Sequence, residues 1–153
     1  MKKDYDLEIK ERCIQNFIEE MRHVDREQGV LLEKEGWFYK ETAERSIVFT
    51  FGKVTLVRRC YVKNGKRRYP VDEYLGLTPY NRYSKFLLYQ LALTKQELSC
   101  RKAAIYFEEL FDVNISKDTV SKARRMANQL YKENQEHGFF EEELFIEEKK
   151  LEV

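Results

Sequence analysis

Cysteine is scarce in this chain of 153 residues, and its three cysteines do not form a recognisable set. Cys13, Cys60 and Cys100 are odd in number and far apart, with no CxxC pair and no Cys/His cluster. Disulfide frameworks need paired cysteines, and structural zinc sites need clustered ligands. The sequence therefore predicts neither kind of cross-link, and a reducing cytoplasm is the expected location.

Long hydrophobic runs are also absent from the sequence. No apolar stretch approaches the roughly 20 residues of a membrane-spanning helix. The lysines of the opening segment, MKKDYDLEIKER, are not followed by the apolar segment of a signal peptide. Apolar residues make up 42% of the chain and charged residues 36%, with a mean hydropathy of -0.68. This composition predicts a soluble protein with enough apolar residues for a core.

Recognisable catalytic sets are a third absence. No Gly-rich phosphate loop, Ser/His/Asp set or metal-ligand spacing occurs in the sequence. His23 lies in a charged stretch with no second ligand nearby, so we expect a surface residue. Asp72 and Glu73 are adjacent carboxylates, but two neighbours do not make a cation site, and a cap or ion-pair role is expected. We therefore expect no enzymatic activity, no cofactor and no bound metal.

Charge is distributed unevenly along the chain. The net charge of +1 combines +10 in residues 36–132 with -3 in residues 1–35 and -6 in residues 133–153. A basic middle between acidic ends favours a polyanion as the partner of the middle. The alternative is that surface charge clusters here by chance.

The hydrophobic pattern predicts a helix, then a sheet, then more helices. Apolar residues repeat at intervals of three and four over residues 5–35, which predicts an amphipathic helix that packs on the body of the protein or dimerises. The period changes to two over residues 45–71, with turn signals at Gly52-Lys53 and Asn64-Gly65, which predicts a three-stranded antiparallel meander. The aromatic residues 37–39 predict a hinge anchored in the core or, alternatively, a surface that stacks on bases.

The predicted meander carries eight cations and no acidic residue. They are Arg45, Lys53, Arg58, Arg59, Lys63, Lys66, Arg67 and Arg68. A small sheet does not need so much charge of one sign for solubility, so we expect a surface that contacts phosphates. The residues expected to hold a DNA backbone are Arg58, Arg59, Lys66, Arg67 and Arg68. The alternative is that Lys and Arg protect edge strands from pairing with other chains.

Residues 98–131 predict two helices joined by a tight turn. Ser99 and Ser116 have the character of N-caps, each followed by apolar residues at helical spacing. A basic second helix that crosses an Ala-rich first helix suits the major groove, as in helix-turn-helix proteins. The residues expected to meet bases or nearby phosphates are Arg101, Lys102, Lys117, Thr119, Lys122, Arg124 and Arg125. The alternative is an ordinary helical hairpin with a solvated basic face.

Together these elements predict an α+β fold in four segments. Residues 1–36 form the N-terminal amphipathic helix, and residues 37–80 form the basic meander with a connecting loop. Residues 81–136 form a helical bundle that contains the helix-turn-helix and begins with a helix capped by Ser84. Residues 137–153 form an acidic tail, with a solvated run at 141–143 and a strand at 144–146.

Two stretches of the sequence resemble a known family. FGKVTLVRRCYVKNGKRRYPVDEYLGL and SCRKAAIYFEELFDVNISKDTV are similar to the N-terminal part of ISLre-type insertion-sequence transposases, also catalogued as an uncharacterised protein family. The shared motifs are Phe-Gly-x-Val-Thr at residues 51–55, Arg-Arg-x-Tyr at 58–61, Asp-Glu-x-Leu-Gly-Leu at 72–77, Tyr-Arg-Lys-Ala-Ala at 100–104 (with Cys100 for Tyr) and Ile-Ser-x-x-Thr-Val at 115–120. The resemblance implies that this region binds the element's terminal repeats as double-stranded DNA.

The sequence departs from this family where the catalytic domain would begin. The resemblance implies a DDE-type transposase, in which three carboxylates bind two divalent metals. Residues 144–148 resemble the strand before the first of these acids, but Lys149 and Lys150 stand where the family has Asp-Gly. We therefore expect a truncated or degenerate transposase that recognises element ends without strand-transfer chemistry. The alternative is an interaction protein or inhibitor that pairs with itself or with full-length transposase through residues 5–35 and the acidic tail.

Overall fold

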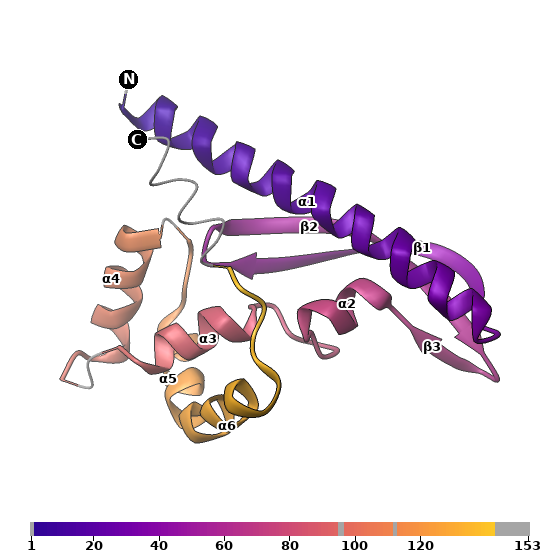
Figure 1. The fold of residues 1–153 in the computed structure, drawn as a ribbon. Helices are drawn as coiled ribbons and strands as arrows, with labels where there is room; N and C mark the ends of the chain where they lie inside the picture. The colour runs from indigo at the N-terminus through magenta and orange to yellow at the C-terminus, as the bar shows by residue number, and fades with distance from the viewer. Residues whose placement is uncertain (1, 95–96, 112, 143–153) are drawn as a thin grey trace.

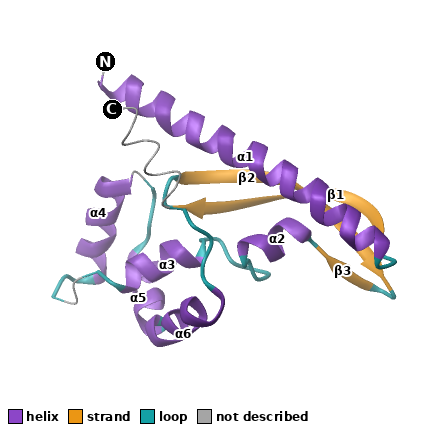
Figure 2. Ribbon diagram, viewed as in Figure 1, coloured by secondary structure: helices purple, strands orange, loops and turns teal. Residues whose placement is uncertain are grey.

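The computed structural model describes residues 2–94, 97–111 and 113–142 of the chain. In these ranges a long helix is followed by a three-stranded antiparallel sheet and then by five shorter helices (Figures 1 and 2). The expected α+β class is confirmed. The strand predicted at residues 144–146 and the departures at Lys149 and Lys150 lie outside the described residues.

The long helix α1 (Lys2–Lys34) lies along the sheet (Figure 1) and confirms the helix predicted over residues 5–35. Its apolar stripe is buried, and Phe17 and Met21 are at most 2% exposed. The Phe17 ring lies 4.8 Å from the Phe49 ring and 5.1 Å from the Phe51 ring, measured between centroids. Of the two predicted uses of this stripe, packing on the body of the protein is the one that the fold employs.

The sheet consists of β1 (Phe38–Phe49), β2 (Gly52–Lys63) and β3 (Lys66–Arg68), in that order. The predicted meander is confirmed, although β1 begins seven residues earlier than predicted and the first turn lies at residues 50–51. The second turn lies at Asn64 and Gly65 as predicted, and both have positive φ, 50° and 77°. Positive φ at both central residues is what a two-residue type I′ hairpin requires.

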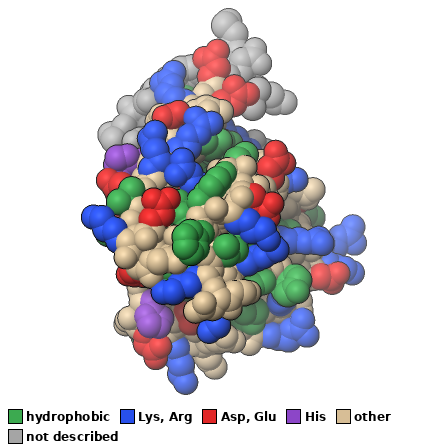
Figure 3. Space-filling model, turned by 90° about the vertical axis from the view of Figure 1, so that its right-hand side faces the viewer, with side chains coloured by type: hydrophobic (Ala, Val, Ile, Leu, Met, Phe, Trp, Pro, Cys, Tyr) green, Lys and Arg blue, Asp and Glu red, His purple; other side chains and the backbone are tan. Residues whose placement is uncertain are grey.

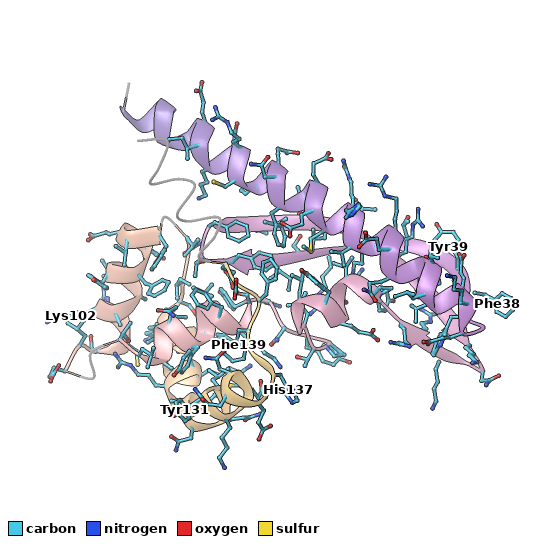
Figure 4. The ribbon with its side chains drawn as sticks, viewed as in Figure 1. Phe38, Tyr39, Lys102, Tyr131, His137 and Phe139 are labelled. Carbon is cyan, nitrogen blue, oxygen red and sulfur yellow. The ribbon has the colours of Figure 1, made fainter. Side chains whose placement is uncertain are left out.

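The aromatic residues 37–39 are not a hinge anchored in the core, which corrects the prediction. Phe38 and Tyr39 begin β1 and are 71% and 51% exposed. Trp37 is half-buried, with the Arg68 guanidinium 5.2 Å from its ring centroid. Figure 4 shows Phe38 and Tyr39 at the end of the molecule that carries β3. The register of β1 places these rings outside the core, and composition alone did not contain that information.

Helix α1 packs closely on the sheet at Gly29. A Cβ atom at Gly29 would lie 2.1 Å from the hydroxyl oxygen of Tyr61, whose side chain is completely buried in β2. A separation this short is far inside van der Waals contact, so a larger residue would have to move the helix or the tyrosine. The absence of a side chain at Gly29 therefore sets the spacing between helix and sheet.

We expect Gly29→Ala to lower the free energy of unfolding by about 1–3 kcal/mol, because the added methyl overpacks the contact with Tyr61. This loss would appear even though alanine favours a helix interior over glycine by about 1 kcal/mol. Urea denaturation measures the change. The control is Gln28→Ala at the exposed neighbouring position, expected to stay within about 0.5 kcal/mol of the parent protein. Equal stability of the two variants would contradict the close approach.

The segment after β3 forms a short helix, where the prediction had only a connecting loop. Helix α2 (Pro70–Leu75) has Pro70 in its first turn and ends at Gly76 in the left-handed conformation. Val71 and Leu75 join Phe17, Phe49 and their neighbours in the core between α1 and the sheet. The chain next returns to the edge of β1, where the Ser84 N–H donates to the Val48 carbonyl at 3.0 Å.

The remaining helices form a second core. They are α3 (Lys85–Ala92), α4 (Cys100–Phe111), α5 (Lys117–Arg125) and α6 (Ala127–His137). Leu87, Ala103, Val120, Ala123 and Leu130 are buried together at its centre. The second helix predicted within residues 98–131 is not continuous, because it breaks at Met126, where φ is -91° and ψ is 3°. The basic segment is therefore a separate helix of nine residues.

The described part of the predicted acidic tail is an integral part of the fold. Residues 138–142 run from the end of α6 back to the sheet (Figure 1). Phe139 packs against Tyr89 of the helical core, and Phe140 packs against Phe17 of the sheet core. Glu142 follows and is completely buried. The predicted solvated run is therefore wrong at Glu142, because this segment connects the two cores.

Candidate nucleic-acid interface

Helices α4 and α5 form a capped helical pair around a short connection. The Ser99 hydroxyl accepts from the Lys102 N–H, and the Ser116 hydroxyl accepts from the Thr119 N–H, both at 3.2 Å. Each bond satisfies one of the donors left free at a helix start. Helix α4 holds this connection in place, because its Glu108 carboxylate accepts from the Ile115 N–H at 3.0 Å. The two N-caps predicted from the sequence are thus confirmed.

Five of the seven cations and polar residues predicted on this pair are exposed. They are Arg101, Lys102, Lys117, Lys122 and Arg125. Arg101 and Lys117 also flank a hollow of about 340 Å³ between α4 and the start of α5. Cations on adjacent exposed turns can approach phosphates without first breaking contacts within the protein. Acidic residues are present nearby too, since Asp118 is exposed on the first turn of α5 and Glu109 is exposed on α4.

The other two residues have structural roles. The Arg124 guanidinium is half-buried and donates to the Leu98 carbonyl at 2.9 Å and to the Thr94 hydroxyl at 3.1 Å. It therefore ties α5 to the connection between α3 and α4. Thr119 is half-buried, and its hydroxyl lies 2.9 Å from that of Ser116 within the N-cap. Neither side chain extends outward as a base-reading residue would, which corrects the expectation for both.

The sheet arginines differ in burial and in their ion pairs, although they are close together in the sequence. Arg58 is only 7% exposed, and its Nε and Nη2 donate to the two oxygens of Asp72 at 3.0 and 3.1 Å. Arg59 is half-buried, 3.8 Å from Asp25, with its guanidinium over the Tyr39 ring. A buried, paired guanidinium cannot reach a phosphate. Arg58 is therefore not available for the contact with a DNA backbone that the sequence predicted.

At the β2–β3 hairpin the cations are more accessible. Arg68 is half-buried and pairs with Glu73 through two bonds of 2.7 and 2.8 Å. Lys66 and Arg67 are exposed. Asp72 and Glu73 thus have the ion-pair roles predicted for them. Lys66 and Arg67 pair with no residue of the described ranges, so they can meet an external anion.

The two groups of exposed cations lie at opposite ends of the molecule. Figure 4 places Lys102 at one end and Tyr39, which belongs to the β3 end, at the other. Figure 1 likewise separates α4 and α5 from β3 by the length of the sheet. The predicted sheet cations and the predicted helix cations therefore do not form one face. One compact contact cannot use both groups, and the α4–α5 group is the larger.

Glu142 is a completely buried ionisable residue that the sequence analysis did not single out. Its Oε1 accepts from the Thr50 N–H at 2.7 Å and from the Thr50 hydroxyl at 3.0 Å, and its Oε2 accepts from the Ser84 hydroxyl at 2.6 Å. Burial raises the pKa of the Glu142 carboxyl from 4.5 to about 7, against the opposing effect of these bonds. Within a run of three glutamates its only distinguishing signal is the preceding Phe139-Phe140 pair, which is apolar enough to return to the core.

No group of three or more His, Cys, Asp and Glu side chains in residues 2–94, 97–111 and 113–142 is placed to hold a metal ion. In the same ranges, no helix combines the length and the apolar character that crossing a bilayer would need.

Comparison with known proteins identifies a relative of this chain. A "UPF0236 protein in vanSb 3'region" from Streptococcus gallolyticus is 29% identical over 87 residues, which make up 56% of this chain and 19% of that protein. This chain is similar to part of a UPF0236 protein. The match spans about a fifth of the relative's length. No family model matches the chain, and no solved structure matches it. The resemblance to an uncharacterised family is thus supported, whereas the relationship to transposases remains a prediction.

Proposed function

We propose that this chain binds double-stranded DNA through the α4–α5 pair, as the end-recognition region of a truncated or degenerate insertion-sequence transposase. The supporting observation is the exposed group of Arg101, Lys102, Lys117, Lys122 and Arg125 on two capped, crossing helices. In helix-turn-helix proteins the second helix enters the major groove with its N-terminal residues against base edges. Here the N-terminal residue of α5 with an exposed, extendable side chain is Lys117.

The two helices would have different tasks in this complex. Helix α5 is short and begins at a capped, fixed connection, so Lys117 and Lys122 would lie along the groove while Arg125 contacts the far backbone. Arg101 and Lys102 lie in the first turn of α4, where the free N–H groups of a helix start add to their positive charge. Recognition of the element's terminal repeats would come from α5, and affinity from the surrounding phosphate contacts. Strand-transfer chemistry is not part of the proposed activity.

Duplex binding should be strongly salt-dependent. Neutralising five phosphates gives a slope of about -4.5 in log affinity against log salt, or roughly a 500-fold loss over a fourfold rise in salt. Removing two cations with Lys122→Ala and Arg125→Ala should weaken binding at low salt and reduce the slope by about 2. Fluorescence anisotropy with a labelled duplex measures both quantities.

The matched control removes two exposed cations from α1, with Arg26→Ala and Lys34→Ala. This double variant has the same change in net charge and should keep the parent salt slope. If the two double variants weaken binding equally, the effect reflects net charge and not the α4–α5 surface. If affinity of the parent chain does not change with salt, phosphate contacts do not carry the binding.

A further inference from the structure

A second hollow lies at the β3 end of the molecule. Its lining residues have no part in the proposed duplex-binding surface. The hollow has a volume of about 420 Å³ and lies between β3, α2 and the loop of residues 76–84. Its lining residues are Arg45, Arg58, Arg67, Arg68, Tyr69, Asp72, Glu73, Leu77, Pro79 and Tyr80. A volume in this range holds a ligand of nucleotide size.

The inner wall of this hollow carries an excess of positive charge. Asp72 is the shared partner of Arg58 and of Arg45, whose Nη1 lies 3.0 Å from the Asp72 Oδ2. The three side chains are between 8% and 14% exposed. One carboxylate thus faces two guanidiniums where little water can screen them, which leaves a positive field directed into the hollow.

The outer wall adds a cation that is available to a ligand. Arg68 is paired with Glu73, so these two charges cancel. Arg67 is exposed, and it makes no ion pair or hydrogen bond with any residue that the structure describes. Across the lining residues, four arginines face two carboxylates. Figure 3, which views this end of the molecule, shows Lys and Arg side chains beside apolar ones. The ligand favoured by this wall is an anion that Arg67 can reach.

Tyr80 at the rim supplies a flat surface. Its side chain is fully exposed, and its backbone has φ of 72°, a conformation that residues with bulky side chains rarely adopt. The Arg45 guanidinium holds the turn by donating to the carbonyls of Thr78 and Asn81. By contrast, the ring of Tyr69 is already covered by Arg58, 4.3 Å from its centroid. At Tyr80, therefore, a strained backbone in an anchored turn presents an uncovered ring beside a cationic hollow. This arrangement indicates a ligand that stacks on the ring.

We propose that this hollow binds a nucleotide unit of single-stranded nucleic acid, with the base stacked on Tyr80 and a phosphate on Arg67. Cationic grooves with exposed aromatic rings are the common solution for binding single strands, because every base has a face that can stack. A base inside a duplex has both faces covered by its neighbours, so the ligand is an unpaired nucleotide. The site is separate from the α4–α5 surface and does not depend on duplex binding there.

The test is anisotropy with a labelled oligothymidylate of about eight nucleotides, a length within the range of known single-strand sites. Tyr80→Ala and Tyr80→Gly should each weaken binding about tenfold, since both remove the stacking ring. Glycine accepts the positive φ, so loss of affinity in Tyr80→Gly cannot result from backbone strain. Tyr80→Phe keeps the ring and should bind as the parent chain does. Arg67→Ala should weaken binding and lower the salt slope by about 0.7.

The matched control is Tyr131→Ala, which removes a 53% exposed tyrosine from α6 (Figure 4). It should leave oligothymidylate binding unchanged. The site is refuted if the parent chain does not bind the oligonucleotide, if Tyr80→Gly binds normally, or if an abasic strand of the same length binds equally well. It is also refuted if Lys122→Ala with Arg125→Ala abolishes single-strand binding, because the strand would then occupy the α4–α5 surface. Loss of duplex binding alone in that double variant leaves this proposal intact and tests only the proposed function.

Discussion

Replacing Asp72 with alanine is expected to lower the free energy of unfolding by about 3–5 kcal/mol, the usual cost of leaving buried charges without their partner. Asp72 lies on α2 and pairs with Arg58 of β2 and Arg45 of β1, with all three side chains largely buried. Removing the carboxylate leaves two guanidiniums close together in a region of low dielectric. A domain of ordinary stability has only about 5–15 kcal/mol in total, so this variant should be close to unfolding.

The same network predicts an asymmetry between its members. Arg58→Ala should cost less than Asp72→Ala, because Asp72 would keep Arg45 as its partner at 3.0 Å. The control is Glu73→Ala, since Glu73 adjoins Asp72 but pairs with Arg68 in a much more exposed position. Exposed pairs contribute at most about 1 kcal/mol. Urea denaturation of the three variants at neutral pH gives the comparison, and equal losses for Asp72→Ala and Glu73→Ala would show that burial of the network has no effect.

Stability is expected to depend on pH through Glu142. Its pKa is raised from 4.5 to about 7 in the folded protein, so between these values the folded chain holds a proton that the unfolded chain has released. The free energy of unfolding should therefore fall as pH rises from 4.5 to 7, by about 3 kcal/mol in total, and change little above that. Below pH 4.5 both states are protonated, and the contribution of Glu142 is constant.

Glu142→Gln isolates this contribution. Glutamine stays neutral, so the difference in stability between the parent chain and this variant should change with pH across the same range. Burial also raises the pKa of Asp25, but that effect is common to both proteins and cancels in the difference. The control is Glu141→Gln at the exposed neighbouring position, which should follow the parent curve. Parallel curves for parent and Glu142→Gln from pH 5 to 8 would contradict a raised pKa at this carboxyl.

Local signals in the sequence were sufficient for most of the secondary structure. The helix over residues 5–35, the hairpin at Asn64-Gly65 and the N-caps at Ser84, Ser99 and Ser116 were all predicted correctly. Each depends on a few neighbouring residues, through hydrophobic spacing, positive φ or a side chain that accepts from its own helix. The break at Met126 was missed because nothing in the residues around it disfavours a continuous helix.

The accessibility of the charged residues, by contrast, could not be predicted from such local signals. Arg58 and Arg59 are adjacent, yet one is buried on Asp72 and the other lies partly exposed near Asp25. Glu142 and Glu141 are also adjacent, and only Glu142 enters the core. In each case two adjacent residues differ in burial. The candidate sites at α4–α5 and beside Tyr80 could therefore be located only after the pairing of each arginine was known.

The sequence by itself determined the order of an N-terminal helix, a three-stranded sheet and a helical region, the excess of positive charge in the middle of the chain and the capped start of α5. Only the tertiary structure decided which cations remain free, that they form two groups at opposite ends, and that Glu142 joins the two cores. The reason is the separation along the sequence of the residues that interact. Helix and turn formation depend on residues within a few positions of each other, whereas the hydrogen bond from Thr50 to Glu142 joins residues 92 positions apart. Contacts of that kind exist only once the chain has folded.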